Sequence, residues 1–174
     1  IDDKAFNGCQ IIEAIISAEN AKCIVNSSLQ KVVFIGGEII EDETFYNCKE
    51  LQTVEFLSPI TSIGTKAFYG CTGLKSIVIP DGVISIGECA FAGCSSLTSI
   101  TIPNSVISIS GYAFDDCPVE NATMPTSAIS RISKANLKTV VITGGTSIGD
   151  RAFFNCSSLT SITIGNSVTS IGSS

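Results

Sequence analysis

The sequence contains no histidine, and only 15% of its 174 residues are charged. Histidine is the commonest general base and metal ligand, so its absence excludes a Ser-His-Asp triad and argues against an enzyme. The net charge of −6 argues against nucleic-acid binding, which needs a basic stripe. No stretch approaches the roughly 18 continuous apolar residues of a membrane span. We therefore expect neither catalysis, nucleic-acid binding nor a membrane-spanning segment.

The residues that are present favour strands and tight turns. The chain is 44% hydrophobic but only 7% aromatic, and Ile, Val, Ser, Thr and Gly dominate it. Such a composition suits β-strands better than long amphipathic helices. The length fits one domain, 1–174, with a substantial core.

A short motif recurs along the whole chain. Six Phe-x-x-Cys tetrads begin at Phe6, Phe45, Phe68, Phe91, Phe114 and Phe153. Their phenylalanines are 39, 23, 23, 23 and 39 residues apart. A fixed period of about 20–30 residues with a Leu-x-x-Ile-x-Ile core is typical of a solenoid.

The two long spacings indicate two shorter coils. Residues 1–66 align without a gap onto residues 109–174, and Leu29 and Leu137 stand where regular repeats have Leu51 and Leu97. The sequence thus predicts eight coils, including two compact coils at about 11–28 and 119–136 that lack Phe-x-x-Cys. Gly36-Gly37 and Gly144-Gly145 replace the usual turn there, and neither opens a helix as a phosphate loop must. We expect no cofactor.

Each coil is predicted to begin with one strand. In 97–102, Leu97, Ile100 and Ile102 point inward by the two-residue period of a strand, and Pro103 ends it. A second short apolar alternation follows at 83–86, and the segment around Phe-x-x-Cys is expected to form a helical turn. The fold class is therefore a β-dominant solenoid. Its main parallel sheet has about eight strands on the concave face, with short strands and helical turns on the convex side.

The repeat Ser-Ile-Gly-x-x-Ala-Phe-x-x-Cys-x-x-Leu-x-x-Ile-x-Ile-Pro resembles the BspA-type leucine-rich repeats of bacterial surface proteins. The resemblance covers nearly the whole chain. It implies a secreted or cell-surface protein and a non-catalytic module that binds a protein, such as a host or matrix protein, through the concave sheet face. A structural spacer and an accessory module of a larger secreted protein are the alternatives.

The Phe and Cys columns are predicted to be core. Six of the eight cysteines occupy one repeat position and should stack as buried thiols, because parallel side chains suit disulfide geometry poorly. One or more disulfides and a metal site stay open as alternatives. Cys23 and Cys89 lie outside this column.

The outward residues of the sheet form two columns. The central column is Ile15, Val33, Glu55, Val78, Thr101, Thr123, Val141 and Thr163. Its neighbour is Glu13, Lys31, Thr53, Ser76, Ser99, Asn121, Thr139 and Ser161. This hydroxyl-rich, β-branched face lacks the aromatic platforms of sugar-binding sites. We predict it as the protein-binding face, although a merely solvated sheet face is the alternative.

Two further hypotheses concern an acidic turn and the chain ends. Glu38, Glu41, Asp42 and Glu43 could hold calcium, although they match no known calcium loop, or could simply form a solvated turn. Neither "IDDKAF" nor "SIGSS" forms a distinctive cap. We therefore expect the chain to be a segment of a longer array, with any signal peptide outside it, or to self-associate end to end.

Overall fold

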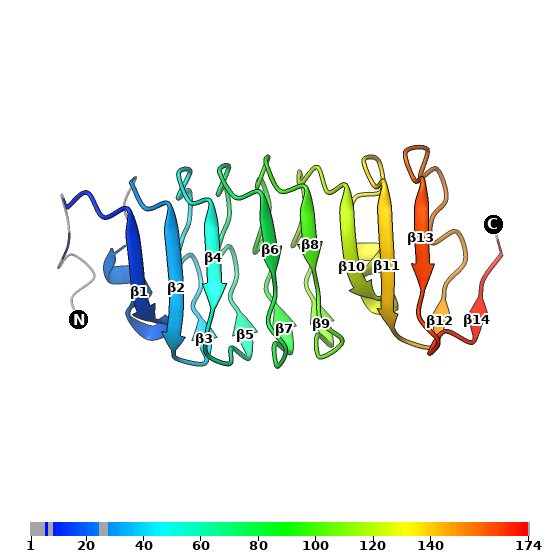
Figure 1. The fold of residues 1–174 in the computed structure, drawn as a ribbon, viewed down its shortest axis with the longest axis horizontal. Coiled ribbons are helices and arrows are strands. Elements are labelled where there is room, and N and C mark those ends of the chain that lie inside the picture. Colours follow the sequence, from blue (N-terminus) through cyan, green and yellow to red (C-terminus); the bar gives the residue numbers. More distant parts are fainter. Residues whose placement is uncertain (1–5, 7–8, 25–27, 174) are drawn as a thin grey trace.

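A computed structural model describes residues 6, 9–24 and 28–173. These residues form a stack of coils, each made of strands and turns, that follow one another in chain order (Figure 1). Eight parallel strands form the main face. They are β1 (Glu13–Ser17), β2 (Lys31–Gly36), β4 (Thr53–Phe56), β6 (Ser76–Val78), β8 (Ser99–Thr101), β10 (Asn121–Pro125), β11 (Thr139–Gly144) and β13 (Ser161–Ile164). The predicted solenoid with one main strand per coil is confirmed.

The pairing of the main strands places like residues of successive coils side by side. Ile100 of β8 pairs with Ile77 of β6 and with Ala122 of β10, and all three are buried. Leu97 and Ile102 are also buried, as the alternation predicts. Hydrogen bonds link the strands in two groups, β1-β2-β4 and β6-β8-β10-β11-β13.

A second row of two-residue strands lies behind the first. Its members are β3 (Ile39–Ile40), β5 (Ser62–Ile63), β7 (Ser85–Ile86), β9 (Ser108–Ile109), β12 (Ser147–Ile148) and β14 (Ser170–Ile171). β3, β5, β7 and β9 form one parallel ladder, and β12 pairs with β14. The second row is interrupted between β9 and β12, where the compact coil 119–136 intervenes.

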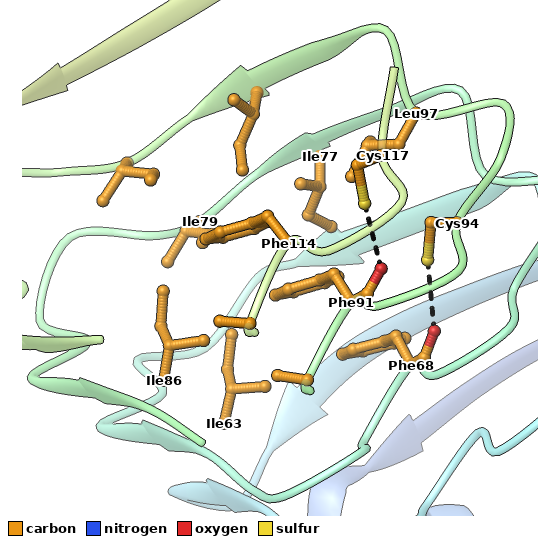
Figure 2. Packing of buried hydrophobic residues seen from close by; sticks show 14 of the residues in the cluster. Ile63, Phe68, Ile77, Ile79, Ile86, Phe91, Cys94, Leu97, Phe114 and Cys117 are labelled. Atoms are coloured by element: carbon orange, nitrogen blue, oxygen red, sulfur yellow. Dashed lines mark hydrogen bonds between the residues drawn. The ribbon is translucent and has the colours of Figure 1, made fainter. Parts of the chain in front are cut away.

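The phenylalanine column forms the centre of the core. Phe45, Phe68, Phe91 and Phe114 are buried, and successive ring centroids lie 5.2 Å apart in nearly parallel planes. Figure 2 shows three of these rings stacked beside the aliphatic side chains of both strand rows. The ends of the column differ from the prediction: Phe153 is half-buried and Phe6 is 38% exposed. Neither has a regular coil stacked on both sides.

The segments around Phe-x-x-Cys are not the helical turns expected from the sequence. In the five such segments from Phe45 to Phe153, two residues take a left-handed backbone, for example Lys66 (φ 53°) and Gly70 (φ 68°). Alternate N–H groups then bond within the turn and to the next coil: Tyr69 N–H donates to Lys66 O, whereas Phe68 N–H donates to Ala90 O. The turns therefore stack as a third ladder of backbone hydrogen bonds.

Helical structure occurs instead in the compact coils. The 3₁₀ helices η1 (Ala18–Ile24) and η2 (Thr126–Arg131) each follow a main strand. Ala128 and Ile129 of η2 are buried, so this helix fills the core where a regular coil would place its phenylalanine turn. The register of β10 against β11 shifts at Pro125, where the chain leaves the sheet for η2.

Candidate binding face

The two predicted outward columns lie in register across the main sheet. Thr101 pairs with Val78 on one side and with Thr123 on the other, and Ser99 pairs with Ser76 and Asn121. Val141 pairs with Thr123 and Thr163, and Thr139 pairs with Asn121 and Ser161. Glu55, Val78, Thr53, Ser76, Asn121 and Thr163 are exposed, whereas Thr101, Thr123, Val141, Ser99 and Thr139 are partly exposed.

Val33 differs from the rest of the predicted face. Its side chain is only 4% exposed. In the ladder it stands between Ile15 and Glu55, and the neighbouring Lys31 side chain extends to a carboxylate on each flanking strand. Longer side chains on three strands therefore cover this valine, and we remove it from the accessible face.

Charge on the main face gathers at β1, β2 and β4. The Lys31 Nζ lies 3.2 Å from Glu13 Oε1 and 3.2 Å from Glu55 Oε1. Hydrogen bonds to Glu55 and then to Glu13 raise the pKa of the Lys31 ammonium. All three side chains are solvent-accessible, so salt will weaken these ion pairs. From β6 to β13 the two columns carry hydroxyl, amide and aliphatic groups only.

A groove separates β4 from β6. No backbone hydrogen bond joins these strands, although their coils stay joined by the β5–β7 pairing behind them. Figure 1 shows the wider gap between β4 and β6. The groove has a volume of 370 Å³ and is lined by Gln52, Thr53, Val54, Glu55, Phe56, Leu57, Ser76, Val78 and Pro80. Leu57 (72% exposed) and Val78 (64% exposed) present apolar surface at its edge.

The groove lies where one partly buried position changes from phenylalanine to isoleucine. Phe56 of β4 stacks on Phe34 of β2 at 5.4 Å, whereas the next coils place Ile79 and Ile102 at this position. A phenylalanine is bulkier than an isoleucine, so the sheet changes its packing where the aromatic pair gives way to aliphatic side chains. Sequence reasoning missed the groove, and Phe56 was the available signal.

The BspA type leucine rich repeat region matches residues 20–135 and 132–174 in six copies. The chain belongs to the BspA-type leucine-rich repeat family. It is thus a repeat scaffold of a kind that typically serves protein interactions and is generally non-catalytic. No curated protein matches the sequence.

Two solved structures share the fold. A leucine-rich repeat protein from Bacteroides ovatus has a TM-score of 0.59 and 27% identity over 94% of this chain. The T. pallidum leucine rich repeat protein has a TM-score of 0.55 and 26% identity over 95% of this chain. The chain spans 39% of the Bacteroides ovatus protein and 69% of the T. pallidum protein.

Three thiols of the cysteine column in this leucine-rich repeat chain, those of Cys71, Cys94 and Cys117, donate hydrogen bonds to backbone carbonyls of the phenylalanine column. Cys94 Sγ donates to Phe68 O at 3.2 Å, and Cys117 Sγ donates to Phe91 O at 3.1 Å (Figure 2). Cys48, Cys71, Cys94 and Cys117 are buried, whereas Cys156 is half-buried and Cys9 is exposed. No disulfide is recorded among the described cysteines. The side chain of Cys23 lies outside the described part of the structure.

Burial also governs the acidity of the cysteine column. It raises the pKa of the Cys48 thiol to about 12 and raises that of Cys71 as well. A hydrogen bond to Cys117 and burial raise the pKa of Cys94. A thiol must lose its proton to act as a nucleophile or metal ligand. These side chains are therefore packing groups.

Two carboxylates of the acidic turn at 38–43 already interact with other groups of the protein. Glu41 Oε2 lies 3.0 Å from Lys22 Nζ, and Asp42 Oδ1 accepts the N–H of Thr65 at 2.7 Å. In residues 9–24 and 28–173, no three His, Cys, Asp or Glu side chains gather as a metal site would require. The geometry thus favours a structural turn over a calcium site.

The chain offers no membrane-spanning helix within its described residues, since none of its helices has the necessary length and apolar character.

Proposed function

We propose that this chain is a non-catalytic protein-binding module that engages its ligand through the main sheet face, with the β4–β6 groove at the centre of contact. The groove carries the proposal, because it brings two exposed apolar side chains, Leu57 and Val78, beside unpaired strand edges. A few anchor side chains that fill well-packed pockets contribute most of the binding energy at protein interfaces, and the groove offers such a pocket to a side chain of the partner. The adjoining Thr, Ser and Asn residues of the two columns supply polar groups that can form hydrogen bonds with the ligand around the groove.

The proposal extends to location and context. BspA-type repeats are typically surface or secreted proteins, and we propose display on a bacterial surface, as a segment of a longer array. Host or matrix proteins are then the ligand class to test. Antibody labelling of intact and permeabilised cells tests the location: label confined to permeabilised cells contradicts it.

The binding test uses matched variants on opposite sides of the solenoid. Leu57→Glu and Val78→Glu place a charge at the groove, whereas Ile84→Glu and Ile107→Glu place the same charge on exposed residues next to β7 and β9. Surface plasmon resonance against purified host matrix proteins measures binding. We expect the groove variants to lose at least about tenfold in affinity, as removal of an interface anchor does. Equal effects of both pairs, or no effect of either, contradict the proposal.

A further inference from the structure

The β4–β6 groove reaches two side chains that pack against the core. Val54 and Phe56 are partly exposed, and both line the groove. Their equivalents one coil further on, Ile77 and Ile79, are buried. The inward positions of the strand are accessible only here, where no backbone hydrogen bond joins β4 and β6. The groove is therefore an opening in the sheet that leads to the Phe56 ring.

One face of the Phe56 ring is already covered by another ring. Phe34 of β2 stacks on it with centroids 5.4 Å apart and planes 15° from parallel. Phe34 lies on the β2 side of the ring, whereas the groove opens on the β6 side. No second ring stacks on Phe56 among the residues that the structure describes. The two-ring stack thus ends at the groove with its outer ring partly exposed.

The core shows which group covers a phenyl face in this fold. Successive rings of the phenylalanine column, from Phe45 to Phe114, lie 5.2 Å apart with planes within 11° of parallel. Stacked aromatic pairs are stabilised beyond the apolar area that they bury. The next residue of the chain's own column, Ile79, is aliphatic and leaves Phe56 partly exposed. A flat aromatic side chain from a partner would continue the stack by one ring.

A missing hydrogen bond beside the ring narrows the choice of side chain. In the next strand pair, Ile79 N–H donates to Thr101 O at 2.9 Å. The equivalent bond from Phe56 N–H to Val78 O does not form, because β4 and β6 share no backbone hydrogen bond. Val78 lines the groove, and its carbonyl lacks the donor that Thr101 has. Tryptophan combines a large ring with an N–H donor and fits both features.

We propose that the β4–β6 groove receives a tryptophan side chain of the protein ligand, stacked on Phe56 with its ring N–H donating to Val78 O. The inference rests on the proposed function and names the anchor that the partner contributes. The groove volume of 370 Å³ is near the lower end of the roughly 300–1,000 Å³ of ligand pockets, which suits one large side chain. Leu57 and Val78, exposed at its edge, add apolar contacts around the ring. Tryptophan is also enriched among the residues that dominate binding energy at interfaces.

Chemical-shift titration by NMR tests the anchor with three small probes. N-acetyltryptophanamide at millimolar concentration should shift the amide signals of Phe56, Leu57 and Ser76. It should bind about 2- to 10-fold more tightly than N-acetylleucinamide, the advantage that ring stacking adds to apolar burial. N-acetyl-1-methyltryptophanamide keeps the ring but lacks the N–H. It should bind about 2- to 10-fold more weakly than the tryptophan probe, as the loss of one hydrogen bond predicts.

Matched leucine variants separate the groove from other exposed rings. Phe56→Leu should weaken binding of the tryptophan probe about 2- to 10-fold and remove its advantage over the leucine probe. Phe154→Leu, at a ring that is 57% exposed elsewhere, should leave both unchanged. A circular dichroism spectrum like that of the parent shows that each variant is folded. The three-probe comparison needs no variant, so it decides the proposal even if Phe56→Leu does not fold.

Three results would overturn the inference. They are equal binding of the leucine and tryptophan probes, unchanged binding after methylation of the ring nitrogen, and Phe56→Leu binding like Phe154→Leu. If Leu57→Glu and Val78→Glu still abolish binding of a matrix protein, any of these results overturns this inference alone. A tryptophan preference in a chain whose protein binding ignores both glutamates overturns the proposed function, while the tryptophan pocket stands.

Discussion

Asn104 and Thr143 hold each other across the compact coil that separates them. Thr143 Oγ1 donates to Asn104 Oδ1 at 2.9 Å, and Asn104 Nδ2 donates to Thr143 O at 3.3 Å. The two residues are 39 positions apart, in the coils on either side of 119–136. This pair therefore links the two flanking coils directly, past the compact coil between them.

A substitution at Gly144 should disrupt the contact between Asn104 and Thr143. A Cβ at Gly144 would lie 2.4 Å from Asn104 Oδ1. We expect Gly144→Ala to break the pair and cost about 1 kcal/mol, the usual value of such hydrogen bonds. In an Asn104→Ala background the same change should be nearly neutral. Urea denaturation of the four chains measures the coupling; additive costs would show that the two sites do not interact.

The phenylalanine column predicts a large loss at its centre. Phe91 is fully buried between Phe68 and Phe114, at 5.2 Å from each. Phe91→Ala should therefore lower the free energy of unfolding by about 3–5 kcal/mol. Phe154→Ala, at a ring that is 57% exposed, is the control and should cost under about 1 kcal/mol. Similar losses at both positions would contradict the stacked core.

The cysteine column predicts a loss of stability in alkali. Because burial raises the pKa of Cys48 to about 12, the unfolded chain releases this proton near pH 8.5 while the folded chain retains it. Stability is thus complete below about pH 8.5 and falls as the pH rises towards 12, by up to about 1.4 kcal/mol per pH unit for each such thiol. The free energy of unfolding from pH 8 to 10.5 checks the slope, which Cys48→Ala should reduce. An unchanged slope in Cys48→Ala would show that this thiol titrates alike in both states.

We expect a smaller side chain at position 56 to close the β4–β6 groove. Phe56→Ile introduces the residue found at positions 79 and 102, where strands pair normally. We expect β4 and β6 to approach and the amide of Ser76 to exchange at least about tenfold more slowly. Phe34→Ile, on the far side of the aromatic pair, is the comparison. Unchanged exchange at Ser76 would show that another residue keeps the strands apart.

The sequence predicted the repeating parts of the fold because they depend on side-chain type alone. Leu97, Ile100 and Ile102 are apolar at strand spacing and are buried. The left-handed turns were not predicted, because helical turns were expected there, although the second left-handed position of the described turns carries residues that favour that backbone: Asn47, Gly70, Gly93, Asp116 and Asn155. The first position gives no such signal, because Glu43, Lys66, Cys89, Tyr112 and Arg151 carry no such preference. There the stacked hydrogen bonds of neighbouring coils impose the conformation.

The candidate sites were less predictable because they arise where the repeat is broken. The columns of the main face followed from periodicity. Val33 is buried because the Lys31 side chain forms ion pairs with carboxylates on both neighbouring strands. The spacing of residues along the sequence does not predict such contacts between side chains. Such differences between neighbouring coils can be seen only once the coils are stacked.

The two 3₁₀ helices mark equivalent positions at a fixed distance along the solenoid. η1 and η2 occupy equivalent places in segments 108 residues apart, and five strand steps separate β1 from β10. At about 4.8 Å per hydrogen-bonded step, and with the wider β4–β6 gap among the five steps, equivalent surfaces beside the two compact coils lie at least about 24 Å apart. A single ligand with two binding segments would need a linker of at least about seven extended residues to reach both, and the second contact would then form at a high effective concentration. The spacing of the two compact coils thus sets the smallest ligand that can touch both of them at once.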